Sequence, residues 1–393
     1  MRYSILTAIT ALMACSPDGT IPTVTVRDSA GVRIVENPES APALNWALDD
    51  EPVVEIGGSD RGDDYELYGV RSAARLTDGR IVVANGGTHE LRFYSSDGTY
   101  LRSAGREGEG PGEFSRMGWV QRMPGDSLFV YDYDLRRIAV FSASGDFVRG
   151  VRLESTPDLP FASPIGVFND RSMLARGFAD TKGVPPDGLQ RYESPIFHLD
   201  PNGLLITELG PFSGNEVYYK AFEGGFGFFD AVFPLDTRFV VRDDVVYLAA
   251  TDSFEIRVLT PDGELLKIVR RKHTQVRVTN EHLRLELERR IAAGGPDERA
   301  STAATFDEIP KPEFFPAYLH LLVDGDRNMW IQEYPIPGAA AAAWSVFDSS
   351  GTLLGEVEAP LGFEPYHIGN EFVLGKWTDE LDVEYVRMYM LRK

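Results

Sequence analysis

Five runs of alternating apolar residues along this chain each reach a glycine-containing turn and then start again. A single hairpin cannot bury its apolar face alone, so a recurrence of this kind predicts stacked antiparallel units with neighbours on either side. The turn glycines are 47, 58, 60 and 88 residues apart, which brackets a blade of about 40 to 50 residues once insertions are included. Each turn has the form Asp-, Ser- or Asn-Gly, which supplies the positive φ of a tight hairpin. The five glycines are Gly98, Gly145, Gly203, Gly263 and Gly351.

Composition fits one large all-β unit. Of the 393 residues 43% are apolar, and 38 Gly and 25 Pro separate short β-branched and aromatic runs.

The net charge of −21 repels polyanions and argues against a nucleic-acid partner. The most basic stretch, residues 270–273, is interpreted as a solvated strand end.

The N-terminus carries a predicted targeting segment. The only cysteine, Cys15, follows a short apolar run that ends in Leu-Met-Ala, and this resembles a bacterial lipobox. The resemblance implies a signal peptide over residues 1–14 and a lipidated Cys15 that anchors the protein to a bacterial membrane. The apolar run is too short to span a bilayer, which favours a removable targeting segment over a permanent transmembrane anchor. Ordinary secretion and a buried N-terminal strand are the alternatives. Ser16 favours the outer membrane by the familiar sorting rule, so the predicted location is the cell envelope, on the outer membrane or its periplasmic face.

Residues 15–45 are predicted to be a lipidated, proline-containing tether, and residues 46–393 the folded domain. One hairpin, TVTVRDSAGVRIVEN, interrupts the tether and is expected to lie on the body as an extra strand pair.

With four strands per blade, five complete blades can be assigned, and the C-terminal segment supplies three further strands. The run PVVEIGG at 52–58 is a strand without a blade. Pairing it with the last three strands would close a ring and remove exposed edges. The predicted fold is therefore an all-β, six-bladed β-propeller of four-stranded blades closed by an N-terminal strand, with five blades as the main competitor.

Two segments resemble a family of uncharacterised bacterial six-bladed β-propeller lipoproteins related to NHL-repeat propellers. They are Trp46-Ala47-Leu48 ahead of PVVEIGG, and GRIVVANGGTHELRFYSSDGTYLRSAGREGEGPGEF from Gly79 to Phe114. The resemblance implies the fold and the lipid anchor, and it implies no established activity.

The four strands of a blade are labelled a to d from the ring axis outward. The b–c loop and the connection from strand d to strand a of the next blade emerge on the same face of the ring, and the long excursions are all of these two kinds. They are residues 105–118, 154–164, 177–195, 211–227 and 271–316. Long loops on a rigid scaffold are where binding is usually built, so this face is the predicted binding face. The excursion at 271–316 contains one predicted helix, Asn280 to Ala293, with Thr279 as its N-cap and an apolar stripe of Leu283, Leu287 and Ile291. The rest of it is expected to be a lid or a loose loop.

The segment GREGEGPGEF contains closely spaced glycines but no Lys-Ser/Thr ending, and its carboxylates would repel phosphate. Its glycines are expected to allow a tight path near the ring axis with Phe114 as a packing plug, while ligand or cation contact is the alternative. Its candidate binding residues are Arg106, Glu107, Glu109 and Glu113.

Further candidates come from the ends of other blades, where oxygen ligands could collect around a Ca²⁺ on the axis or simply form a solvated acidic rim. They are Asn85, His89, Asp132, Asp134, Asp252, Glu333, Lys376 and Trp377. The six histidines show no zinc spacing, although His320 and His367 fall on predicted innermost strands. No nucleophile elbow is present, so no catalytic residue is assigned.

Two functions fit these patterns. The first is a membrane-anchored, monomeric binding or scaffolding module that captures a small molecule, glycan or protein with the long-loop face and needs no cofactor. The second is a metal-dependent hydrolase or lyase that is lactonase-like in scaffold only, with calcium or zinc at the axis.

Overall fold

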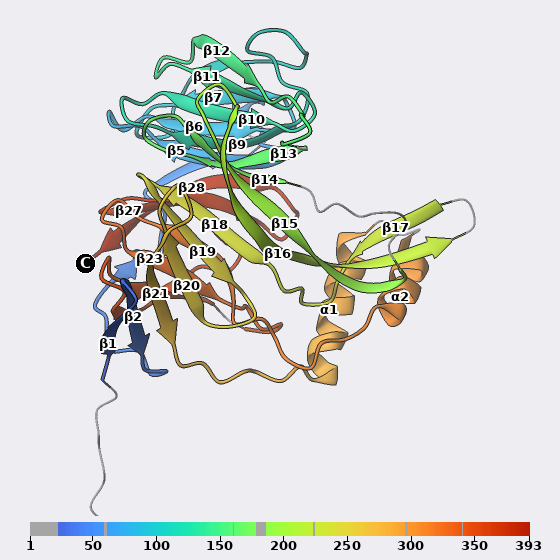
Figure 1. Ribbon diagram of the computed structural model, residues 1–393. Helices are drawn as coiled ribbons and strands as arrows, with labels where there is room; N and C mark the ends of the chain where they lie inside the picture. Colours follow the sequence, from blue (N-terminus) through green and yellow to red (C-terminus); the bar gives the residue numbers. More distant parts are fainter. Residues whose placement is uncertain are drawn as a thin grey trace, which may run out of the picture.

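The computed structural model describes residues 23–58, 61–159, 161–177, 186–222, 225–294, 298–339 and 341–393. Residues 1–22, which hold the predicted signal peptide and Cys15, lie outside the described residues. The described strands form six sheets, and each contains a four-stranded antiparallel unit. Figure 1 shows the sheets built from residues 70–152 in the upper part of the view and the strands of residues 237–392 below them.

Four of the six blades are made of consecutive strands alone or with one addition at the outer edge. Blade 1 is β5 (Val70–Arg75), β6 (Ile81–Asn85), β7 (Glu90–Tyr94) and β8 (Tyr100–Ala104). Blade 2 is β9 (Met117–Arg122), β10 (Leu128–Asp132), β11 (Arg137–Phe141) and β12 (Phe147–Arg152). Blade 3 is β13 (Ala162–Val167), β14 (Met173–Gly177), β15 (Gly188–Leu199) and β16 (Leu205–Phe222), with β17 (Gly225–Asp230) added. Blade 5 is β22 (Tyr318–Val323), β23 (Met329–Glu333), β24 (Ala342–Phe347) and β25 (Leu353–Ala359).

Blades 4 and 6 incorporate strands from the N-terminal part of the chain. Blade 4 is β18 (Thr237–Arg242), β19 (Val245–Ala250), β20 (Glu255–Leu259) and β21 (Leu265–Arg271), extended by β2 (Val32–Asn37) and β1 (Thr25–Ser29). Blade 6 is β26 (Phe363–Ile368), β27 (Phe372–Thr378) and β28 (Glu384–Arg392), to which β4 (Val54–Gly57) and β3 (Ala47–Leu48) pair. The β4–β28 pairing is the predicted closure, with Ile56 opposite Val386.

Six buried clusters hold the ring together, one between each pair of neighbouring blades. The cluster between blades 6 and 1, for example, joins Ile56 and Val386 to Ile81 and Val83. Because each sheet presents apolar side chains on both faces, every blade needs two neighbours, and only a closed ring supplies them to all six. The predicted six-bladed all-β fold is confirmed.

The N-terminal hairpin β1–β2 forms as the sequence predicted. Strand β2 runs parallel to β21 on the outside of blade 4, where the two strands pair over five residues. Asn37 fixes its end, since Nδ2 donates to the carbonyls of Gly351 (2.9 Å) and Arg270 (3.0 Å) and Oδ1 accepts from the amide of Leu353 (2.8 Å). Asn37 is 2% exposed, so this amide joins the hairpin to blades 4 and 5.

The third blade departs from the prediction. Residues 188–195 and 211–222 were expected to be loops, but β15 and β16 continue through them and extend beyond the blade, where β17 pairs with β16. The extension forms because aromatic residues alternate along it, as in Tyr219 opposite Phe228. Figure 1 shows this arm projecting to the right with the two helices beside it.

The excursion between blades 4 and 5 contains two helices where one was predicted. Helix α1 (Asn280–Ala293) has the predicted bounds and cap, and α2 (Arg299–Glu308) forms in the segment that was expected to be a lid or a loose loop, so this part is not a loose loop. The predicted stripe is only half-buried, and the buried residue of α1 is Glu286, which pairs with Arg290 (2.7 Å). Neither described helix is long and apolar enough to cross a membrane. A separate small core joins these helices to the arm, built around Tyr218, Val232, Phe233, Phe306, Ile309 and Phe315.

Candidate functional site

The long connections lie on one face of the ring. In each complete blade the a–b and c–d turns span a few residues, as at residues 76–80 and 95–99 of blade 1. Because the strands alternate in direction, the remaining connections emerge at the opposite ends, and these include the arm and both helices. We call this side the long-loop face.

A pocket of about 470 Å³ opens on the long-loop face where the inner strands of blades 2, 3 and 4 meet. It is called here the axial-mouth pocket. Strands β9, β13 and β18 provide most of its wall, and β14 and the β15–β16 arm provide the rest. Its lining consists of Trp119, Tyr133, Ser163, Pro164, Ile165, Arg176, Gly177, Ser194, Asn215, Asp236, Thr237, Arg238 and Phe239.

Three aromatic rings form the apolar part of this wall, and their positions are fixed by neighbours. The indole N–H of Trp119 donates to the carbonyl of Pro164 (3.0 Å), which joins blade 2 to blade 3. Tyr133 packs edge-on against Tyr131, with ring centres 5.0 Å apart. Phe239 packs edge-on against Phe212 of the arm at 5.7 Å. A flat apolar group could therefore stack here without the wall rearranging.

The polar part of the wall carries two arginines and one carboxylate. Asp236 lies 3.2 Å from the guanidinium of Arg238 and 3.7 Å from that of Arg176. Arg176 makes one hydrogen bond among the described residues, from Nη2 to the carbonyl of Thr237 at 3.3 Å, and its buried Nε has no acceptor. Burial lowers the pKa of Arg176, only partly offset by Asp236. The hydroxyl of Thr237 is also buried without a partner.

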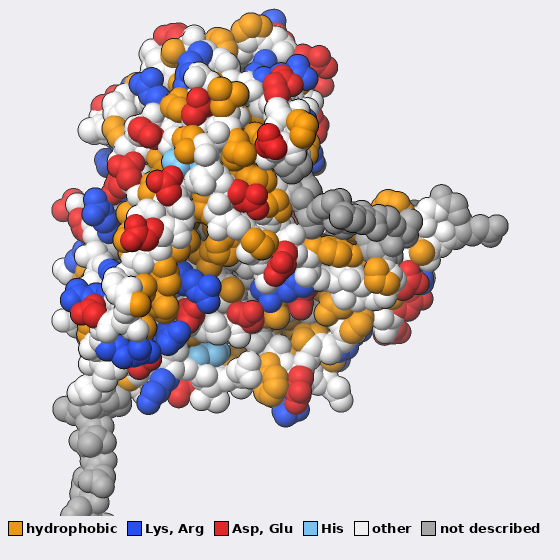
Figure 2. Space-filling model, in the orientation of Figure 1, with side chains coloured by type: hydrophobic (Ala, Val, Ile, Leu, Met, Phe, Trp, Pro, Cys, Tyr) orange, Lys and Arg blue, Asp and Glu red, His pale blue; other side chains and the backbone are white. Residues whose placement is uncertain are grey.

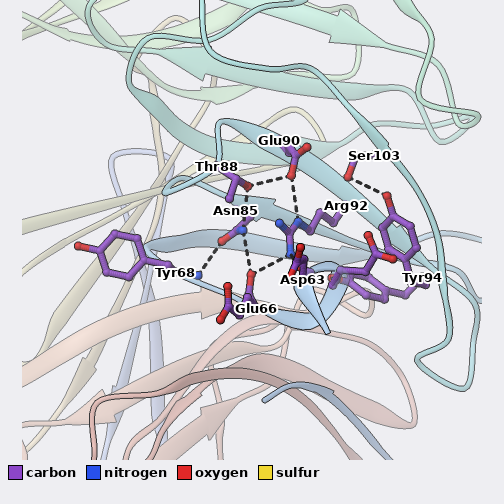
Figure 3. A network of polar contacts seen from close by, with 11 residues as sticks. Asp63, Glu66, Tyr68, Asn85, Thr88, Glu90, Arg92, Tyr94 and Ser103 are labelled. Atoms are coloured by element: carbon purple, nitrogen blue, oxygen red, sulfur yellow. Dashed lines mark hydrogen bonds and ion pairs between the residues drawn. The ribbon is translucent and has the colours of Figure 1, made fainter. Parts of the chain in front are cut away.

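The predicted candidate Asn85 has a structural role. It is fully buried, its Oδ1 accepts from the amide of Tyr68 (2.8 Å) and its Nδ2 donates to the carbonyl of Glu66 (3.3 Å). Figure 3 shows this network, in which Arg92 donates to the carbonyls of Glu66 and Asp63, both at 2.8 Å. The network holds the connection that includes the 3₁₀ turn η2 (Asp63–Tyr65) against blade 1.

Asp132 occupies the matching position in blade 2 and has the same role. It is 1% exposed, and its Oδ2 accepts from the amides of Ser115 (2.8 Å) and Arg116 (3.1 Å) in the incoming connection. In blade 4 the hydroxyl of Thr251 accepts from the amide of Asp236 (2.9 Å). A polar residue at the end of the second strand therefore fastens the chain entering each of these blades.

The GREGEGPGEF segment lies elsewhere than predicted. It packs against the outer strands of blade 2 rather than near the ring axis, because Arg137 of β11 donates to the carbonyls of Gly110 (2.9 Å) and Glu113 (2.7 Å). Phe114 is fully buried and stacks on Phe141 with ring centres 5.8 Å apart, so it does act as a packing plug, between blades 1 and 2.

The four candidate residues of that segment have different surroundings. Arg106 is 79% exposed and pairs with Glu113, and its hydrogen bond is the main cause of the lowered pKa of that carboxyl. Glu107 is exposed and pairs through its backbone with Phe114, while exposed Glu109 accepts from Arg137 through its carbonyl (3.1 Å). All four lie away from the axial-mouth pocket.

Three acidic candidates form ion pairs on the long-loop face. Asp134 pairs with Arg116 at 2.8 Å, next to the pocket residue Tyr133. Asp252 pairs with Arg191 at 3.1 Å and lines three smaller cavities around the base of the arm. Glu333 pairs with Arg271 at 2.7 Å.

The last three candidates lie on blades 1 and 6. His89, at a φ of 58°, contacts the carbonyl of Ser115 through Nε2 (2.8 Å) and thus links blades 1 and 2. Lys376 pairs with Glu364 at 3.3 Å. The indole N–H of Trp377 donates to the carbonyl of Leu361 (3.1 Å), and the ring lies under Arg387. The structure brings none of these three to the axial-mouth pocket.

The two histidines on inner strands lie among arginines. Burial lowers the pKa of His320 to about 4 and that of His367 to about 3, and one nearby arginine adds to the first shift and three arginines add to the second. For His367 these are Arg122, Arg242 and Arg75. Within the described ranges no group of three His, Cys, Asp or Glu residues could hold a metal ion. The positive charges along the inner strands are unsuited to a cation there.

A hydrogen-bonded Ser-His-Asp series lies on the face opposite the long-loop face. His198 contacts the hydroxyl of Ser172 through Nε2 (2.9 Å) and the carboxylate of Asp262 through Nδ1 (3.1 Å). Ser172 is 1% exposed and donates its proton to Asp170 (2.6 Å), so the hydroxyl cannot reach a substrate. These contacts link blade 3 to blade 4 and do not form a nucleophile with its base.

Comparisons with known proteins agree with this architecture. A family model described as a 6-bladed beta-propeller matches residues 63–164. A solved structure of a Bacteroides fragilis protein thought to be exported covers 91% of this chain and 99% of its own length, at 11% identity and a TM-score of 0.51. A member of the DUF4221 family from Bacteroides vulgatus covers 88% and 98%, at 11% identity and a TM-score of 0.53. No curated protein matches the chain. The chain is a six-bladed β-propeller.

The matched segment of the propeller includes the stretch from Gly79 to Phe114, on which the predicted resemblance to uncharacterised propellers depended. That resemblance is confirmed. The segment also contains Trp119 and Tyr133, whereas Arg176 and Thr237 lie beyond it. The charged half of the propeller's axial-mouth pocket therefore lies outside the matched part of the chain.

Proposed function

We propose that this protein is a membrane-anchored binding module of the bacterial cell envelope, and that the axial-mouth pocket captures a small molecule. The observation that carries the proposal is the pocket itself. At about 470 Å³ it has the size of ordinary ligand sites, and it combines an aromatic wall with two residues, Arg176 and Thr237, whose hydrogen-bonding capacity is not fully used among the described residues.

The scaffold around this pocket suits binding without rearrangement. The wall comes from inner strands, which have a neighbouring blade on each side, and Trp119 is fixed by its bond to Pro164. A ligand that meets such a wall does not bear the free-energy cost of ordering loose side chains. The arm contributes Ser194 and Asn215 to the lining, and the two helices lie beside the arm (Figure 1). Hydrophobic side chains are exposed along the arm (Figure 2), which extends the surface that a larger ligand would meet.

The test is binding of aromatic fragments, measured by ligand-observed NMR and followed by titration calorimetry. We expect Trp119→Ala to weaken fragment binding at least about tenfold, because one face of the stacking site is lost. Trp377→Ala, on blade 6 and outside the pocket, is the matched control and should leave affinity unchanged. Equal binding by the wild type, Trp119→Ala and Trp377→Ala would contradict this use of the pocket.

The envelope location is supported by the lipobox-like sequence around Cys15. Figure 1 shows the N-terminal hairpin at the lower left, far from the arm on the right. An anchor that precedes the hairpin would therefore attach to the protein away from the arm. The fold neighbour from Bacteroides fragilis is thought to be exported, which agrees with this location.

The anchor has its own test. Full-length protein expressed in a bacterium should enter the membrane fraction and incorporate labelled fatty acid, and Cys15→Ser should abolish both. Ser16→Ala is the matched control and should retain the label. Labelling of Cys15→Ser, or soluble wild-type protein without label, would contradict lipidation at this residue.

A further inference from the structure

The charges of the axial-mouth pocket determine which class of ligand it can take. Arg176 and Arg238 line it, and Asp236 is the one acidic residue among its described lining residues, which together carry a net positive charge. The chain as a whole carries −21. At physiological ionic strength, charges beyond about 8 Å are largely screened, so the local arginines outweigh the distant acidic surface for a ligand inside the pocket.

Arg176 is the less completely paired of the two arginines. A guanidinium has five N–H donors, yet the polar contacts of Arg176 among the described residues comprise one hydrogen bond of 3.3 Å and one carboxylate at 3.7 Å. The guanidinium also lies over the ring of Phe239, with its central carbon 5.6 Å from the ring centre. Arg238, by contrast, donates to the carbonyl of Leu319 at 3.0 Å and lies 3.2 Å from Asp236. The side chain of Arg176 is 27% exposed, so part of the guanidinium is open to the pocket.

Desolvation makes this incomplete pairing costly. A buried polar group without a partner loses its hydration and regains nothing, and the loss is larger for a charged group. Burial accordingly lowers the pKa of Arg176. A bound anion would supply an acceptor to the part of the guanidinium that is open to the pocket, and Thr237 lines the same pocket.

From this combination we infer that the pocket selects an organic anion in which a carboxylate is attached to a flat apolar group. The carboxylate pairs with Arg176, and the apolar group lies against the rings of Trp119, Tyr133 and Phe239. This inference rests on the proposed function, because it names the ligand class of the same pocket.

The experiment compares matched pairs of probes: 2-naphthoate with 2-naphthamide, and phenylacetate with phenylacetamide. Each pair has the same apolar group and differs in charge. We expect the acids to bind wild-type protein at least about tenfold more tightly than the amides, since a charge-assisted bond to a desolvated arginine discriminates by this much. Arg176→Gln should remove the difference, because it weakens binding of the acids more than binding of the amides.

A circular-dichroism spectrum and unfolding transition like those of the wild type, together with remaining binding of the amides, show that Arg176→Gln is folded and keeps its pocket. Arg106→Gln, at an arginine that is 79% exposed and outside the pocket, is the matched control and should retain the preference for acids. If acids and amides bind equally well and both depend on Trp119, the pocket binds ligands but the inferred selectivity is wrong. If neither binds in a Trp119-dependent way, the proposed function itself fails.

Discussion

Ile56→Asp is expected to destroy the folded state. Ile56 is fully buried in the closing strand β4, opposite Val386, within the cluster that joins blades 6 and 1. Removing its side chain costs about 2 to 5 kcal/mol, and burying an unpaired carboxylate costs several more. The total approaches the whole stability of a typical domain, about 5 to 15 kcal/mol. We expect aggregated protein, or protein without a cooperative unfolding transition by circular dichroism.

The control for this experiment lies three residues away. Val53 is 50% exposed and its amide still donates to the carbonyl of Met388 (2.8 Å), so Val53→Asp adds a charge to the same segment without burying it. We expect a change within about 0.5 kcal/mol. If Ile56→Asp unfolds no more readily than Val53→Asp, the N-terminal strand does not close the ring.

Closure of the ring could be predicted from sequence because it depends on local patterns and on a count. Each hairpin can be recognised from its own turn and its alternating apolar residues. The C-terminal blade lacks one strand and the N-terminal segment has one strand without a blade, so pairing the two accounts for both. The register, with Ile56 opposite Val386, follows from which face of each strand is apolar. The two strands, β4 and β28, are far apart in the sequence, but each would otherwise leave an unpaired edge, and this identifies them as partners.

The arm and the second helix could not be predicted in the same way. Strands β15 and β16 continue past the blade because Tyr219 and its neighbours pair with β17, and that pairing becomes stable only with the small core around Phe306 and Phe315. The segment that forms α2 has a weak apolar pattern, and Phe306 is its one buried residue. Its helix depends on tertiary contact rather than on its own sequence.

The candidate site shows where sequence reasoning fails and why. Acidic and amide residues at strand ends, such as Asn85 and Asp132, were predicted to bind a ligand, but the same residue types also fasten backbone amides, and the structure uses them for that. The residues that do line the pocket, such as Trp119, Arg176 and Phe239, come from three blades. A signal was present in Arg176 and Arg238, which are charged residues at the ends of apolar strands, but only geometry brings them together.

Gly351→Ala is expected to be the most destabilising of the turn substitutions. Gly351 has a φ of +99°, and the same conformation recurs at the four equivalent glycines, with φ between 84° and 88°. A Cβ atom at Gly351 would lie 2.6 Å from the side chain of Val269 in blade 4 and 3.3 Å from that of Val35. Backbone strain of about 1 to 2 kcal/mol and overpacking of about 1 to 3 kcal/mol would then add.

Gly125→Ala separates these two causes. Gly125 also has a positive φ, of +78°, but no atom lies within 4 Å of the position that its Cβ would take. Urea unfolding should therefore show a loss of about 1 to 2 kcal/mol for Gly125→Ala and about 2 to 5 kcal/mol for Gly351→Ala. Equal losses would mean that the turn needs glycine for its backbone alone. A larger loss at Gly351 would mean that the recurring glycine also sets how closely each blade approaches the one before it, which is why a single residue type marks every repeat.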